Sequence, residues 1–280
     1  MADVLRGRIR SGELRPGQRM PTQARLADEF GVERGAVRQA LRILQSEYLL
    51  TNVSKGSPAT VAPRLNAAVL GGPGAAPRST TVELAPRMSA AFAAPRVKID
   101  ALCLTSVSLT LAVGEALREI HAGRTKPARV DVRVMLPSRD IPLAFPTPVH
   151  PSVDGRLQRR WLAQRNAQGQ VLRHNLLALR STHGVDVHVS FRALPFTPPV
   201  KLYLLNGREA LFAYYTVRRT EAEVDSEHLE MYDAEGTRSM LFAFEQGAVA
   251  ASRDTAFVEQ SRLWFEALWE TISSDLLLTG

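Results

Sequence analysis

The chain has 280 residues, of which 45% are hydrophobic and 22% charged, a composition that suits two globular domains and excludes a disordered or fibrous protein. No apolar run approaches the roughly 18 residues of a membrane span and no signal peptide is recognised, so we expect a cytoplasmic protein without membrane contact. Lys and Arg outnumber Asp and Glu by 35 to 28, which favours nucleic acid as a partner, and the single Cys103 excludes an internal disulfide or a cysteine-rich zinc site.

Residues 21–46 predict two helices joined at Gly31. The first helix should begin after Thr22, whose hydroxyl can accept a hydrogen bond from an unpaired backbone N–H. Gly31 can adopt the positive φ that ends this helix and turns the chain. The second helix has apolar residues at helical spacing on one face: Val37, Ala40, Leu41 and Leu44.

Arg34, Arg38 and Arg42 lie off that apolar face at steps of four. They form either a solvated cationic face or, near the start of the helix, contacts to DNA, where arginine can bond to guanine or to phosphate. The flanks favour DNA, because a short helix precedes this pair and residues 52–62 form two extended runs around a Lys-Gly turn, as in a β-wing.

Residues 4–62 resemble the winged helix-turn-helix of the GntR family of bacterial transcription regulators. The matching stretches are IRSGELRPGQRMPT, RLADEFGV and RGAVRQALRIL, followed by the Lys-Gly wing. The resemblance implies double-stranded DNA as the partner, with the following contacts: Arg25, Arg34, Arg38, Lys55 at a phosphate and Gly56 near the minor groove.

Two positions depart from the family pattern, because Glu33 and Gly35 stand where Ser or Thr is usual. Glu33 either caps the helix and favours its dipole, or accepts a hydrogen bond from a cytosine amino group.

The rest of the chain divides into a linker and a second domain. Residues 63–96 are rich in Pro, Gly and Ala and predict a linker, with a candidate short strand at 82–84. Beyond them we expect strands at 97–104, 130–136, 185–191, 200–206, 209–217 and 239–245, an irregular segment at 137–155, and helices at 109–123, 155–182 and 256–274. The predicted fold is therefore α+β and multidomain: a winged helix-turn-helix (1–62), a linker (63–96) and an α/β sandwich around a mixed sheet (97–280).

Residues 183–215 resemble the phospholipase D-like fold around its H-x-K-x4-D signature. Pro199, Lys201 and Asn206 occupy the three signature positions, and only the lysine remains. Proline has no side-chain lone pair to attack phosphorus, so the resemblance implies an inactive domain with no catalytic residue, retained for dimerisation or ligand sensing. A homodimer would address a palindromic operator with half-sites about 10 bp apart or a multiple of that spacing.

Lys201, Tyr203 and Asn206 are the candidate ligand-binding residues of this domain, for an effector that the sequence does not identify. The alternative for Lys201 is an exposed strand residue. The helix at 155–182 presents either a solvated basic face or an anion site through its arginines: Arg159, Arg160, Arg165 and Arg173.

We expect no metal and no cofactor. His174, His183 and His188 are close in sequence but span a helix end and a strand, without a carboxylate pair at ligand spacing. Cys103 lies in an apolar run typical of a buried small hydrophobe rather than a redox sensor. The last helix carries residues at helical spacing that indicate core or a dimer interface: Trp264, Phe265, Leu268, Trp269 and Ile272.

Three functions fit the sequence. The first is a GntR-type transcription regulator that is not an enzyme. The second is a phosphodiesterase or nuclease tethered to DNA by its winged helix, in which His183 or His188 would have to replace the missing nucleophile. The third is a structural DNA-binding protein without an effector.

Overall fold

The structure is a computed structural model that describes residues 1, 4–5, 8–9, 13–14, 17–46, 50–51, 59–61, 77–150, 155–224, 227–247 and 252–279. Contacts divide the chain into two compact units, Met1–Val69 (unit 1) and Leu70–Gly280 (unit 2). Each unit has its own buried apolar core.

The described residues of unit 1 include two helices of defined bounds, α2 Gln23–Phe30 and α3 Arg34–Ser46, and an antiparallel pair of short strands, β1 Leu50–Thr51 and β2 Thr60–Val61. In this strand pair Leu50 lies opposite Val61, and both side chains are buried. The core of the unit is closed by Leu26 of α2 and by Val37, Leu41 and Leu44 of α3. The helix-turn-helix predicted at residues 21–46 is therefore confirmed.

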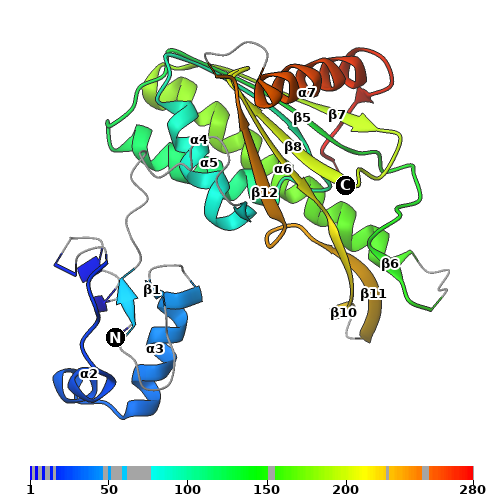
Figure 1. Cartoon of the computed structure of the whole chain (residues 1–280). Coiled ribbons are helices and arrows are strands. Elements are labelled where there is room, and N and C mark those ends of the chain that lie inside the picture. The colour runs from blue at the N-terminus through cyan, green and yellow to red at the C-terminus, as the bar shows by residue number, and fades with distance from the viewer. Residues whose placement is uncertain are drawn as a thin grey trace. The chain divides into compact units, whose positions relative to one another are not determined.

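Unit 2 is built on an eight-stranded mixed sheet in the order β13-β7-β5-β4-β8-β9-β12-β3 (Figure 1). Its strands are β3 Arg78–Ser79, β4 Arg96–Leu102, β5 Arg129–Pro137, β7 Asp186–Leu194, β8 Val200–Leu205, β9 Glu209–Tyr214, β12 Met240–Glu245 and β13 Ser274–Asp275. Strands β4, β5 and β7 are parallel, and the other pairings are antiparallel.

Helices cover both faces of this sheet, as Figure 1 shows, so the α/β arrangement around a mixed sheet is confirmed. The helices are α4 Thr80–Phe92, α5 Val107–His121, α6 Arg156–His183 and α7 Arg253–Glu270. Helices α4, α5 and α6 pack on one face, whereas α7 packs on the other through Phe265 and Trp269. Trp264 on the opposite side of α7 is 42% exposed. The aromatic residues of α7 are thus divided between core and surface.

A second, three-stranded sheet was not predicted. It pairs β10 Thr216–Val224 with β11 Glu227–Glu235, and β11 with β6 Thr147–Pro148 inside the segment that we expected to be irregular. The β10–β11 hairpin extends away from the large sheet (Figure 1). Its strands carry many exposed charges, so they lack the apolar alternation by which a half-buried strand is recognised.

The linker prediction for residues 63–96 is wrong over its second half, and residues 63–76 lie outside the described part. Residues 80–92 form α4, which also contains the segment 82–84 that we expected to be a strand. Alanine favours helix strongly, and Leu84, Met88 and Phe92 follow the helical period and are buried. The low-complexity composition led us to predict a linker where the chain forms an amphipathic helix.

Arg87 of α4 holds the helix to the sheet through buried ionic contacts. Its side chain is 2% exposed and bonds to Glu83 at 2.6 Å, to Glu245 at 2.8 Å and also to Glu209. Burial raises the pKa of Glu209, and the adjacent guanidinium group opposes that rise. The arginine thus neutralises carboxylates from α4, β9 and β12.

We expect Arg87→Met to lower the free energy of unfolding of unit 2 by about 3–5 kcal/mol at neutral pH, because it leaves buried carboxylates without a counter-charge. This loss of unfolding free energy should become smaller on acidification. The pKa of Glu209 is already raised by burial, and it rises further without Arg87, so acid protonates the carboxylate and removes the unpaired buried charge. All three tryptophans lie in unit 2, so their fluorescence during urea unfolding follows that unit.

Arg118→Met is the matched control. Arg118 is 68% exposed and pairs with Glu115 on the surface of α5, so its loss should change stability by less than about 0.5 kcal/mol. Equal effects of the two substitutions would show that the Arg87 contacts contribute no more than a surface ion pair.

Candidate functional site

Helix α2 begins and ends at the residues that the sequence predicts. The Thr22 hydroxyl accepts a hydrogen bond from the Arg25 backbone N–H at 3.3 Å, which caps the first turn. Gly31 has φ of 61° in the left-handed region and closes the helix. The chain therefore reverses within a few residues, and α3 starts at Arg34.

Helix α3 has two faces of opposite character. Val37, Ala40, Leu41 and Leu44 are buried in the core of unit 1. Arg34, Arg38 and Arg42 are exposed, as is Arg25 on α2. Because the apolar face fixes the rotation of the helix, the guanidinium groups are directed to solvent, where they are accessible to a polyanion.

Glu33 lies at the N-terminus of α3, where its backbone oxygen accepts hydrogen bonds from Ala36 N at 3.0 Å and Val37 N at 3.3 Å. Its side chain is exposed at the positive end of the helix dipole. The predicted wing residues Lys55 and Gly56 lie outside the described residues; β2 lies within the predicted wing and pairs antiparallel with β1, which ends just before it.

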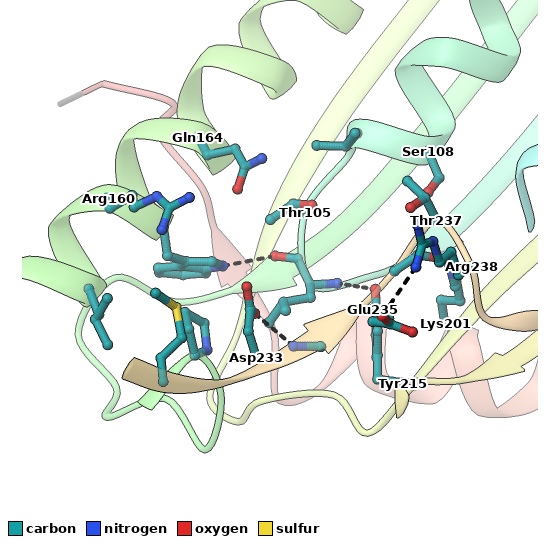
Figure 2. A pocket seen from close by; sticks show the side chains of 18 residues that line it. Thr105, Ser108, Arg160, Gln164, Lys201, Tyr215, Asp233, Glu235, Thr237 and Arg238 are labelled. Carbon is teal, nitrogen blue, oxygen red and sulfur yellow. Dashed lines mark hydrogen bonds and ion pairs between the residues drawn. The ribbon is translucent and has the colours of Figure 1, made fainter. Parts of the chain in front are cut away.

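Unit 2 contains a cavity of about 290 Å³ between the β4–α5 connection, α6, and the end of β11 (Figure 2). Strands β4 and β8 pair antiparallel with Leu102 opposite Leu202. Lys201 therefore lies beside the point where the chain leaves β4 to begin α5. In Figure 2, Arg160 and Gln164 lie on the α6 side, and Lys201 and Arg238 lie near the β11–β12 turn.

Lys201 is buried, with 1% of its surface exposed, so the alternative of an exposed strand residue is wrong. Its ammonium group donates a hydrogen bond to the Gly236 carbonyl and lies 5.4 Å from the centre of the Tyr215 ring. Burial lowers the pKa of Lys201 to about 8, because the charged form loses hydration. The lysine is therefore a cation held at the wall of a cavity.

The cavity is framed by hydrogen bonds that join distant segments. The Trp161 indole N–H of α6 donates to the Leu104 carbonyl at 3.3 Å, and the Leu104 N–H donates to the Tyr215 hydroxyl at 2.8 Å (Figure 2). Asp233 accepts a bond from Ala234 N at 2.7 Å. Leu104, Trp161 and Asp233 were missed because they come from separate elements, and nothing in their local sequence signals that they meet.

The prediction that Lys201, Tyr203 and Asn206 form one ligand site is wrong in its grouping. Only Lys201 lines the cavity. Tyr203 lies on the same face of β8 but roughly 6.6 Å further along, since a strand advances about 3.3 Å per residue, and it is buried in the core. Asn206 is in the β8–β9 turn with φ of 53°, where its side chain accepts from Lys98 N at 2.8 Å and donates to Ala91 O at 3.0 Å.

The arginines of α6 do not share one face. Arg159, Arg160 and Arg173 are exposed, whereas Arg165 is buried and bonds to the Pro137 carbonyl at 2.6 Å. Burial lowers the pKa of Arg165 to about 10. The interpretation of a solvated or anion-binding basic face therefore excludes Arg165.

The histidines lie apart, and the described residues contain no group of three or more His, Cys, Asp or Glu that could hold a metal ion. His183 packs against His121 with ring centres 4.8 Å apart, and His188 lies 3.4 Å from Asp131 on the sheet. Cys103 is fully buried, as predicted, and burial raises the pKa of its thiol to about 12.

Unit 1 thus has the elements of a winged helix-turn-helix DNA-binding domain. Residues 1–61 match the family of bacterial regulatory proteins of the gntR type, so this segment is a GntR-family helix-turn-helix domain. The mannosyl-D-glycerate transport/metabolism system repressor MngR of Escherichia coli K12 is 47% identical over 53 residues, 19% of this chain. The match spans 22% of that repressor, or about a fifth of its length.

A solved structure of TrmBL2, an archaeal chromatin protein described as showing a novel mode of DNA binding, aligns with 91% of this chain and 88% of its own. The TM-score is 0.35 and the sequence identity is 11%.

We expect Gly31→Ala to destabilise unit 1 by about 1–2 kcal/mol, because a Cβ is strained at positive φ. No atom lies within 4 Å of the position that this Cβ would occupy, so the cost is one of backbone conformation. Hydrogen exchange of the α3 amides measures the change.

Gly35→Ala tests the same methyl addition inside α3, where there is also open space. It should stabilise the helix by about 0.5–1 kcal/mol, because alanine restricts the unfolded chain. A loss of protection in both variants would contradict the conformational explanation.

Proposed function

We propose that the protein is a GntR-type transcription regulator that binds a palindromic operator as a homodimer. The observation that carries the proposal is the division of α3, whose buried face anchors the helix while Arg34 and Arg38 remain exposed near its N-terminus. Arginine at that position of a recognition helix can form paired hydrogen bonds to guanine or contact phosphate. A protein that acts on bacterial DNA in this way works in the cytoplasm.

Arg25 supplies a further DNA contact from α2, and the wing residues Lys55 and Gly56 contact a phosphate and the minor groove. Phosphate contacts position the domain without reading sequence, whereas base contacts select the operator. Glu33 serves as a helix cap or reads a cytosine, and its replacement would alter operator preference only in the second case.

Unit 2 is the proposed dimerisation and sensing domain, with an inactive phospholipase D-like fold. Supporting this, Pro199 offers no nucleophile, and the Asn206 side chain is engaged with backbone groups in the β8–β9 turn. Lys201 is the part of the signature that faces a cavity, and it is the proposed ligand contact. We therefore assign no catalytic activity to the protein. The described residues contain no helix long and apolar enough to span a bilayer.

Arg34→Ala and Arg38→Ala should each weaken binding to the preferred duplex by roughly 1–3 kcal/mol, if each guanidinium group makes paired base contacts. The duplex is first selected from a genomic fragment pool with the wild-type chain, and affinities are then measured by fluorescence anisotropy.

Arg173→Ala, which removes an exposed arginine from α6 in unit 2, is the control and should leave the affinity unchanged. Unaltered binding by both α3 variants would mean that α3 is not the recognition helix.

A further inference from the structure

The ammonium group of Lys201 is buried without an acidic partner among the described residues. It is 1% exposed, its hydrogen bond goes to the neutral carbonyl of Gly236, and no carboxylate raises its pKa. Glu235 also lines the cavity, but it pairs with Arg218 at 3.4 Å and Arg238 at 3.9 Å. Because a buried unpaired charge is costly, this position calls for an anion that the chain itself does not supply.

The N-terminus of α5 opens into the same cavity. Thr105, Val107 and Ser108 line it, and α5 is a helix of 15 residues. The first N–H groups of a helix have no intrahelical acceptor and form its positive end, which favours an anion. Ser106 occupies the cap position without a side-chain capping bond, and its buried hydroxyl has no hydrogen-bond partner in the described part of the chain.

The remaining walls limit what the anion can be. The volume of about 290 Å³ is at the small end of ligand cavities. Trp161 and Tyr215 provide aromatic surface, while Asp233 and Glu235 disfavour a long polyanion such as nucleic acid. The cavity therefore suits a small molecule with one anionic group and a compact apolar or ring portion.

We propose that this cavity binds a small organic anion, whose phosphate or carboxylate group is held between Lys201 and the first turn of α5, with Trp161 against the rest of the molecule. The anion is the effector of unit 2. Only this last step rests on the proposed regulatory function, because binding to the cavity does not require DNA.

Isothermal titration of the full chain with phenyl phosphate, benzoate and inorganic phosphate tests the proposal, with phenol as the uncharged counterpart. At least one anion should bind saturably with one site per chain, and phenol should not. Lys201→Met, which preserves most of the side-chain volume, should weaken binding at least about tenfold, as expected for a lost charge-assisted contact. Lys98→Met removes a lysine that is 47% exposed, and it should change the affinity less than about twofold.

The pH dependence provides a second readout on the wild-type chain. The pKa of Lys201 is about 8, so the anion affinity should fall by about tenfold per pH unit above that value, as the ammonium group loses its proton. Burial raises the pKa of Cys103, Tyr203 and Tyr215, so these neighbours stay protonated over this range. The other charged groups that face the cavity are Arg160, Asp233, Glu235 and Arg238.

Arg160→Ala changes an exposed residue at the cavity and serves if Lys201→Met does not fold; it should weaken anion binding several-fold. The proposal is overturned if none of the three anions binds saturably up to about 10 mM, a very weak affinity. The proposal is also overturned if Lys201→Met leaves the anion affinity unchanged. If that variant does not fold, the proposal is overturned when neither Arg160→Ala nor a rise in pH changes the anion affinity. Saturable anion binding by a wild-type chain that selects no operator would separate a failure of the proposed DNA recognition from a failure of this site.

Discussion

The functional interpretation depends on one constraint: α3 must bury one face and expose the other. Val37, Leu41 and Leu44 are fixed in the core of unit 1, so the helix cannot rotate without exposing them. That restriction keeps Arg34 and Arg38 on the solvent side, at the end of the helix that follows the Gly31 turn. The stability of the small core and the presentation of the arginines are therefore consequences of the same packing.

The charge of Lys201, which has no acidic partner among the described residues, lies where the sheet of unit 2 changes from parallel to antiparallel pairing. Strands β4 and β5 are parallel, whereas β8 runs antiparallel to β4, which brings the start of β8 beside the end of β4. Lys201 consequently meets the N-terminus of α5 at the carboxyl edge of the parallel strands, where α/β folds commonly bind ligands. Of the other buried cations, Arg87 has carboxylates from three elements, whereas Arg165 bonds to the neutral oxygens of Pro137 and Asn166. Lys201 lines a cavity, as neither Arg87 nor Arg165 does, and this makes the Lys201 cavity the part of unit 2 best suited to a ligand.

Features set by residues close in sequence could be predicted from the sequence, whereas most features set by contacts between distant segments could not. Thr22, Gly31 and the apolar period of α3 act within a few residues, and each was predicted correctly. Helix α4 was missed because the low complexity of residues 63–96 indicated a linker, although Leu84, Met88 and Phe92 follow the helical period; its contacts to Glu209 and Glu245 lie far along the chain. The sequence pointed to single residues of the cavity, Lys201 and Arg160, but not to their meeting, because the walls come from β8, α6 and β11 and the strand register that brings these elements together is set by the folded sheet.

The most direct test of the account is selection of genomic duplex fragments by the full-length protein, followed by affinity measurements on the recovered and scrambled sites at low and high salt. The account predicts one recurrent palindrome, with half-sites about 10 bp apart or a multiple of it, that stays preferred over the scrambled duplex at both salt concentrations. Recovery of unrelated fragments, bound equally and lost together as salt rises, would show that the arginines of unit 1 bind only phosphate and would contradict sequence-specific regulation.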